Sequence, residues 1–284
     1  MSQTSLLEKC CLIGQSVTGN PTHFMVEQAF AAAGIDWRFL TFEVNESKLV
    51  DALRGAAALG FSGMLLLPSL QRLSWEHISK HTDRADQTRS VSILLRREDR
   101  LIGDDLAGES VAACIVRSHP IAGRHAAVLG LEGRGLATAF ALLQHGAASL
   151  RVVDFGHEEG EPLINRLRAA YPDHPIESID ADEQYIDLPA EVNLIMCASC
   201  WAKERDPLTA EALAGSLRGD MVVADARVRA GLSPLLHAAA DRGAKVVTGV
   251  EILTREIAEA IRLWTGVEPP EDVLMDAAEE FLGV

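Results

Sequence analysis

Residues 126–155 read AAVLGLEGRGLATAFALLQHGAASLRVVDF. The apolar run Ala126–Leu129 predicts a strand, and the glycines that follow it predict a tight turn into a helix rich in Ala and Leu. Gly146 is expected to end that helix, and Leu150–Val153 predicts a second strand. This order of strand, glycine turn, helix and strand is typical of the unit that binds dinucleotides.

The glycine turn is the part of this unit that would hold phosphate, because backbone N–H groups and the helix macrodipole favour an anion at the start of a helix. Gly130, Gly133 and Gly135 are present, but Glu132 stands where the second glycine of the G-x-G-x-x-G pattern belongs. A carboxylate at that position is expected to occupy the space of the pyrophosphate and to repel it. The turn therefore combines a binding pattern with one unfavourable residue.

The second strand is followed by Asp154, 19 residues after Gly135. An acidic side chain at about this distance can bind the ribose hydroxyls of NAD, and it would repel the 2′-phosphate of NADP. The sequence therefore favours NAD as the cofactor, with NADP as the weaker alternative. The candidate cofactor-binding residues are Gly130, Gly133, Arg134, Gly135 and Asp154.

Length and composition limit the class of protein. A chain of 284 residues favours two domains, and 48% apolar with 24% charged residues is ordinary for a folded protein. The sequence shows neither a secretory signal nor an apolar run of the roughly 18 residues that a membrane helix needs, so we expect a cytoplasmic protein with no membrane partner. A net charge of −15 argues against a nucleic-acid partner but allows a small anionic substrate. We expect a monomer or a homodimer.

The five cysteines are Cys10, Cys11, Cys114, Cys197 and Cys200. An odd number without a signal peptide is typical of a reducing compartment. Cys197 and Cys200 form one C-x-x-C, but a zinc site needs two more ligands, and none stands out at a suitable spacing. We therefore expect no metal and favour buried structural thiols, with a redox pair, a metal site or a role in a pocket as alternatives.

Strand-like and helix-like segments alternate along the chain, which predicts an α/β protein of two domains. Residues 1–107 are expected to form an α/β substrate-binding domain with a mostly parallel sheet, and the last helix, within 268–284, is expected to pack back onto it. Residues 108–267 are expected to form a Rossmann-like dinucleotide-binding domain. The other expected strands are 10–13, 37–44, 63–67, 90–95, 176–179, 194–197, 221–225 and 245–248.

Two longer stretches carry a resemblance to a known family. Cys11–Val44 reads CLIGQSVTGNPTHFMVEQAFAAAGIDWRFLTFEV, and Gly249–Val273 reads GVEILTREIAEAIRLWTGVEPPEDV. With the glycine turn, they make nearly the whole chain resemble the shikimate dehydrogenases. The resemblance implies a two-domain α/β fold in which the C-terminal Rossmann domain binds NADP or NAD, and it implies oxidoreductase activity on a small cyclic hydroxy acid.

The resemblance also points to residues that would hold the substrate. The family binds the substrate carboxylate through two hydroxyls of an S-x-S stretch, and the matching positions are Asn20 and Thr22. A glutamine that contacts substrate in the family matches Glu256, which would add a negative charge. Alternatively, Asn20 only caps the helix that follows it.

The proton-handling pair of the family is missing at the matching positions. The lysine of its T-x-P-x-K pattern falls on Leu70 or Gln71, and the aspartate of its N-T-D segment falls on Ala107. None of these side chains exchanges a proton at neutral pH. Asp105 matches the asparagine of that segment and is our candidate catalytic residue, although a solvated acid in a turn is the alternative.

Residues near the expected nicotinamide position also depart from the family. Its N-A-T stretch becomes Met196-Cys197-Ala198, and a tyrosine becomes Val228. One interpretation is an NAD-dependent oxidoreductase with an altered substrate or altered chemistry. The other is a catalytically inactive ligand-binding or scaffold paralogue. The turn glycines and Asp154 favour the first interpretation.

Overall fold

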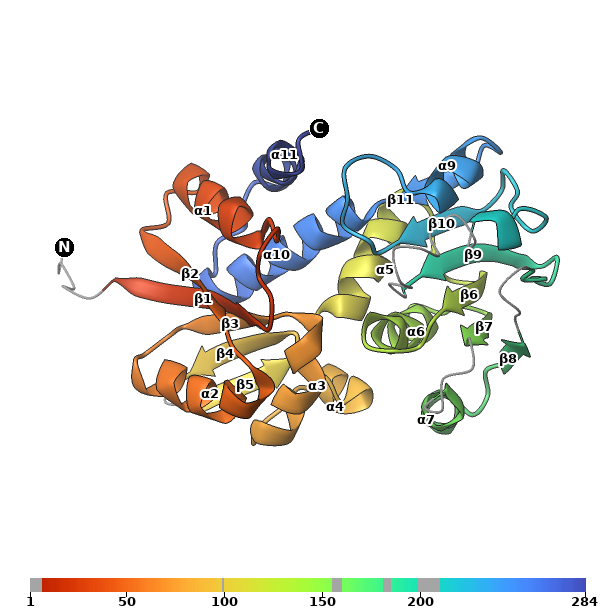
Figure 1. The fold of residues 1–284 in the computed structure, drawn as a ribbon. Helices are drawn as coiled ribbons and strands as arrows, with labels where there is room; N and C mark the ends of the chain where they lie inside the picture. Colours follow the sequence, from red (N-terminus) through yellow and green to blue (C-terminus); the bar gives the residue numbers. More distant parts are fainter. Residues whose placement is uncertain (1–6, 99, 155–159, 181–184, 199–209) are drawn as a thin grey trace. The chain divides into compact units, whose positions relative to one another are not determined.

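The computed structural model describes residues 7–98, 100–154, 160–180, 185–198 and 210–284 (Figure 1). They fall into two compact units: one runs to Leu106 and also contains Thr254–Val284, and the other is Ala107–Leu253. The sequence placed the second boundary at residue 267, whereas the later part of helix α10 (Gly249–Thr265) belongs to the first unit. The reason is that the C-terminal end of α10 packs on the first sheet, where the Trp264 indole N–H donates to Leu94 O at 3.1 Å.

The first unit is built on a sheet with strand order β2-β1-β3-β4-β5. Strands β1 to β3 are parallel, β4 runs antiparallel to β3, and β5 runs antiparallel to β4. The sequence did not predict β5. The elements of this unit, besides α10, are β1 (Glu8–Gly14), α1 (Thr22–Ala32), β2 (Trp37–Glu43), η1 (Glu46–Lys48), α2 (Leu49–Ala58), β3 (Gly63–Leu66), α3 (Pro68–His77), α4 (Asp83–Thr88), β4 (Ile93–Arg97), β5 (Arg100–Asp104) and α11 (Glu271–Leu282).

Helices pack on both faces of this sheet, because successive strand residues point to opposite sides. Cys11 and Ile13 point into a cluster that includes residues of α2 and α3. On the other face, Phe39 lies 6.3 Å from Trp264, measured between ring centroids. Gly63 makes room for that indole, since an added Cβ would lie 1.9 Å from its Nε1. Helix α11 packs against α1, so the C-terminal helix lies on the first unit.

In the described part of the second unit, six parallel strands form a sheet with the order β11-β10-β9-β6-β7-β8. This order is that of a doubly wound dinucleotide-binding sheet. The elements are α5 (Ala107–Ser118), β6 (His125–Leu129), α6 (Arg134–Gln144), β7 (Ser149–Asp154), α7 (Gly160–Ala170), β8 (Ile176–Asp180), β9 (Val192–Cys197), β10 (Val222–Asp225), α9 (Pro234–Ala240) and β11 (Lys245–Val247).

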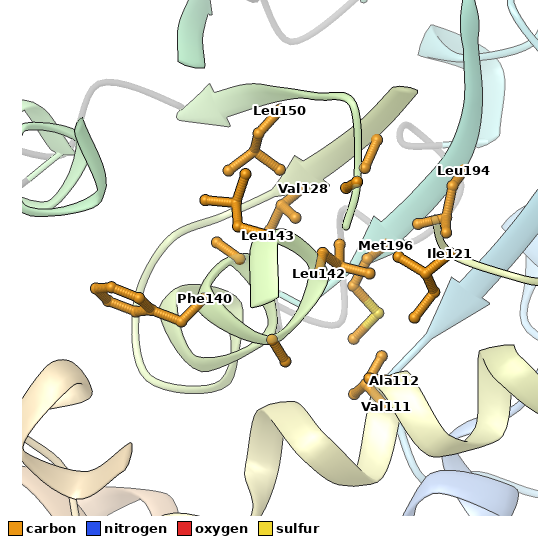
Figure 2. Close-up of a cluster of buried hydrophobic side chains, with 14 of the residues drawn as sticks. Val111, Ala112, Ile121, Val128, Phe140, Leu142, Leu143, Leu150, Leu194 and Met196 are labelled. Atoms are coloured by element: carbon orange, nitrogen blue, oxygen red, sulfur yellow. The ribbon is translucent and has the colours of Figure 1, made fainter. Parts of the chain in front are cut away.

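The larger core of the second unit lies between this sheet and helices α5 and α6, as Figure 2 shows. Val128, Leu150 and Leu194 enter it from three adjacent strands, and Leu142 enters it from α6. The opposite face of the sheet packs against a second cluster that includes α9. Apolar packing on both faces explains why the central strands read as continuous apolar runs.

Candidate functional site

The glycine turn lies where the strand order of the second unit reverses. The chain passes from β6 to β7 on one side and later returns to β9 on the other side of β6. In open parallel sheets, ligands bind outside the carboxyl ends of the strands at such a switch point. The sheet order thus places Gly130–Gly135 at the position where this fold binds nucleotides.

The turn has the backbone conformation that its glycines allow. Gly130 has a φ of 82°, and its N–H donates to Val153 O at 2.9 Å. Gly133 is the N-cap of α6 with a φ of 51° and a ψ of −110°, values that other residues adopt only with strain. Helix α6 therefore starts at Arg134 and directs its N-terminus toward the turn.

Gly135 allows the first turn of α6 to approach the strand ends. An added Cβ there would lie 1.9 Å from Gly130 O and 3.2 Å from the Cβ of Ala198. Ala198 follows β9 and donates its N–H to Leu129 O at 3.1 Å. The ends of β6 and β9 and the start of α6 thus converge at a residue that has room for no side chain.

Glu132 does not prevent the turn from closing. Its side chain is exposed, and its backbone carbonyl accepts a hydrogen bond from the Gly135 N–H at 3.0 Å. Arg134 is half-buried and donates from Nη1 to Ala107 O at 3.4 Å. The backbone turn therefore forms with the Glu132 carboxylate in place.

Two residues singled out in the sequence are only partly described or not described. Asp154 is the last residue of β7 and pairs with Asp180 of β8, but its side chain lies outside the described part of the chain. Cys200 lies outside the described residues altogether. Asp154 therefore stands at the carboxyl end of the strand next to β6, which leads into the turn.

In the first unit, Asn20 and Thr22 lie directly before and at the start of α1. The Asn20 Oδ1 accepts a hydrogen bond from the Thr22 N–H at 2.9 Å, and Thr22 is buried. Helix α1 starts one residue later than its Asn-Pro signal predicts, with Pro21 as N-cap. The bond occupies the Asn20 oxygen with a capping role and leaves its NH2 group as the part that can donate to a carboxylate.

Asp105 is buried with 3% of its surface exposed, so it is not the solvated turn acid that the sequence left open. Its N–H donates to the Asp104 Oδ1 at 2.8 Å, and the next N–H, of Leu106, donates to the Ser92 Oγ at 2.8 Å. The carboxyl end of β5 is therefore held at two successive amides. Sequence reasoning missed both Asp104 and Ser92, because nothing local distinguishes them from other polar residues at strand ends.

The positions that match the family's lysine face the protein interior. Leu70 on α3 is completely buried in an apolar cluster. Gln71 is also buried, and its Nε2 donates to Leu66 O at 2.8 Å. The structure thus gives neither position a proton-transferring group. Glu256, on the part of α10 that belongs to the first unit, is buried as well, with 7% of its surface exposed.

Another buried carboxylate, which the sequence did not single out as a site residue, ends β10. Asp225 accepts hydrogen bonds from Arg227 Nε at 2.9 Å and from Ser233 Oγ at 2.6 Å. Burial raises the pKa of Asp225, while Ser233, the Arg227 N–H and the charge of Arg229 oppose the shift. An acid that ends an apolar strand and precedes an arginine by two residues was the available signal. This group fixes the loop after β10 at the carboxyl edge of the sheet.

The described cysteines are Cys10, Cys11, Cys114 and Cys197, and all four are buried. The described residues hold no cluster of three or more His, Cys, Asp or Glu side chains with the arrangement of a metal site. None of the described helices is both long enough and apolar enough to span a membrane.

The chain is similar in sequence to known dehydrogenases along almost its whole length. No known family model matches the chain. The shikimate dehydrogenase (NADP+) of Archaeoglobus fulgidus is 27% identical over 270 residues, which cover 94% of this chain and 96% of that protein. This relationship confirms the resemblance inferred from the motifs.

Solved structures share the whole architecture. A 5-ketofructose reductase from a Gluconobacter species superposes with a TM-score of 0.90 at 23% identity and covers 97% of this chain and 99% of its own. The shikimate 5-dehydrogenase of Listeria monocytogenes, solved in complex with shikimate and NAD, gives 0.85 at 20% identity, with 97% and 98% covered. These likenesses confirm the predicted fold class, an α/β protein with a Rossmann-like C-terminal part.

Proposed function

We propose that this protein is an NAD(P)-dependent oxidoreductase of the shikimate and quinate dehydrogenase type, acting on a small anionic hydroxy acid. The observation that carries this proposal is the glycine turn at the switch point of a six-stranded parallel sheet, with Gly135 required by the close approach of Gly130 O. A turn of this kind at this place has a direct use in binding pyrophosphate. The relatives named shikimate dehydrogenase support the same conclusion.

We further propose that NAD is preferred over NADP. Asp154 ends the strand next to the turn, and a carboxylate at that place would accept hydrogen bonds from a ribose diol and repel a 2′-phosphate. Asp154→Ala should therefore raise the affinity for NADP relative to NAD. A variant that leaves the ratio of the two dissociation constants unchanged contradicts this part of the proposal.

The role of Glu132 can be tested separately. Because its carboxylate lies beside a site for an anion, Glu132→Gly should tighten NAD binding, and Glu132→Gln should give part of that gain. Weaker binding in Glu132→Gly would mean that the carboxylate has a positive role, such as holding Arg134 or a cation. Isothermal titration with NAD measures both variants.

The substrate and the proton transfer are proposed to differ from those of the family. Leu70 and Ala107 cannot exchange protons, whereas Asp105 lies in the same segment as Ala107 and is buried. Reduction of a ketone requires a proton donor beside the carbonyl oxygen, and a carboxyl group is a side chain that can fill this role. Asn20, Thr22 and Glu256 are the residues proposed to bind the substrate.

The alternative is a ligand-binding or scaffold protein without catalytic activity. The burial of both Leu70 and Gln71, the two positions that match the family's lysine, supports this alternative, because neither side chain can transfer a proton. The two proposals agree on ligand binding and differ on turnover. As further expectations, we place the protein in the cytoplasm, as a monomer or homodimer that binds no nucleic acid.

A two-step experiment tests the proposal. Thermal unfolding is first measured with NAD, NADP and ADP-ribose, since a ligand at 100 times its dissociation constant stabilises by about 2.7 kcal/mol. Cofactor reduction is then followed with a panel of shikimate, quinate and other hydroxy acids, and oxidation of NADH or NADPH with 5-ketofructose. Stabilisation with turnover supports the oxidoreductase, stabilisation without turnover supports the alternative, and no stabilisation at millimolar nucleotide refutes the proposed cofactor site.

A further inference from the structure

The carboxylate of Asp104, at the end of β5, accepts four hydrogen bonds, about as many as a carboxylate has acceptor sites. Its Oδ1 accepts from the Thr82 Oγ at 2.5 Å and from the Arg84 Nε at 3.1 Å. Its Oδ2 accepts from the Arg84 Nη2 at 2.6 Å. The Asp105 N–H supplies the fourth bond, to Oδ1 at 2.8 Å. All donors belong to the first unit.

These hydrogen bonds fix the orientation of the Asp104 carboxylate as well as its position. The Arg84 guanidinium binds the carboxylate with two parallel N–H groups, and such a fork sets the plane of the carboxylate as well as its place. The Asp104 side chain is only 3% exposed, so water competes weakly for these bonds. With its plane set from one side, Oδ1 presents a fixed acceptor to the Asp105 N–H on the other side.

We propose that Thr82, Arg84 and Asp104 form a positioning group that holds the backbone of Asp105 and thereby the direction of its carboxyl. The inference rests on the proposed function for the statement that Asp105 acts on substrate, and on the hydrogen bonds alone for the statement that the group holds it. Thr82 also caps α4, accepting from the Ala85 N–H at 3.4 Å, so α4 is the element that anchors the group.

Arg84 has a further consequence for charge. Two acidic residues adjacent in the chain, Asp104 and Asp105, are both buried. The guanidinium of Arg84 balances the charge of Asp104. The ion pair with Arg84 therefore offsets a buried negative charge directly beside Asp105 in the chain.

The amide of Leu106 provides an internal reference. It donates to the Ser92 Oγ, a side chain directly before β4 that makes no bond to the Asp104 carboxylate in the contacts described above; Ser92 meets Asp104 through the backbone, where its N–H donates to Asp104 O at 2.9 Å. A change that only destabilises the first unit should speed exchange at both amides alike. A change that removes the positioning group should act on Asp105 and spare Leu106.

The experiment compares Arg84→Ala, Arg84→Lys and Asp104→Ala with two controls. Thr82→Ser keeps the hydroxyl, and Arg38→Ala removes an exposed arginine that pairs with Asp36 at 3.2 Å. Hydrogen exchange of the two amides is read by NMR in the full-length protein. We expect exchange at Asp105 to rise by about tenfold or more in Arg84→Ala and Asp104→Ala, less in Arg84→Lys, and not in the controls.

Kinetics with the best substrate of the panel provides the second readout. We expect kcat to fall by about 10- to 100-fold in Arg84→Ala with a small change in KM, because misdirection of a reacting group affects the chemical step most. Arg84→Lys should recover part of kcat. Equal acceleration of both amides, or selective acceleration with unchanged kcat in an active enzyme, overturns the proposal.

Failure of the proposed function is distinguishable from failure of this inference. A wild-type protein without turnover on the panel and without nucleotide binding refutes the function. The exchange data still decide whether the group holds Asp105. An active wild-type protein with an unchanged Asp105 amide in Arg84→Ala refutes the positioning group alone.

Discussion

Gly135→Ala should be the most damaging single-methyl addition in the dinucleotide turn. The new Cβ would lie 1.9 Å from Gly130 O, about 1.5 Å short of ordinary contact, and the backbones of Gly130 and Gly135 are each held by another hydrogen bond. We expect a loss of about 3 kcal/mol, at the upper end of the range for overpacking. For a unit of this size the loss corresponds to a melting point lower by roughly 6–12 °C.

The assay is differential scanning calorimetry, which can resolve the two units if they unfold separately. Gly215→Ala is the matched control in the same unit, because an added Cβ there meets nothing within 4 Å. The control should melt like the wild type and keep its stabilisation by NAD, whereas Gly135→Ala should lose that stabilisation. A melting point of Gly135→Ala within about 2 °C of the control would refute the close approach of helix and strand ends.

Three further predictions concern the first unit. Leu70→Lys should not restore the family's lysine but should destabilise by about 4 kcal/mol in urea unfolding, because it buries an unpaired charge, while Ser69→Lys on the exposed neighbour should change stability little. A hydrogen bond from Arg262 lowers the pKa of Glu259 below its ordinary 4.5, although burial opposes the shift. The stability that the ionised Glu259 adds is present above about pH 4.5 and is lost as the pH falls through its folded-state pKa. The difference in the free energy of unfolding between wild type and Glu259→Gln should therefore shrink below pH 4, and a difference that grows contradicts the lowered pKa. Burial raises the pKa of Cys11 to about 12, so iodoacetamide at pH 8 should label it only after unfolding, and rapid labelling of the native protein, read by mass spectrometry, would show that the thiol is accessible.

Much of the candidate site was predictable where the signal is local. The turn from Gly130 to Gly135 was found because positive φ angles and close packing require glycine, and that requirement shows directly in the residue type. The position of Asp154 at the end of a strand followed from the apolar run before it. The nucleotide-binding half could thus be proposed from spacing alone.

The other half could not be predicted, because its residues are defined by contacts between distant segments. Asp105 was equally compatible with a solvated turn and a buried site until the structure showed it 3% exposed. Arg84 binds Asp104, the residue before Asp105, from a position 20 residues earlier in the chain. Ser92 binds the amide of Leu106 from a position 14 residues earlier. Neither pairing leaves a pattern in the sequence.

By itself, the sequence determined the alternation of strands and helices, the glycine turn and the loss of the lysine and aspartate at their matching positions, because periodicity, backbone strain and side-chain chemistry are properties of single residues and their near neighbours. Only the tertiary structure decided that β5 joins the first sheet and that α10 ends in the first unit. It also decided that the carboxylate of Asp104 is held by hydrogen bonds and that Asp105 is buried next to it in the chain. These outcomes depend on which surfaces remain to be covered once the strands have paired, and burial of that kind is a property of the whole fold.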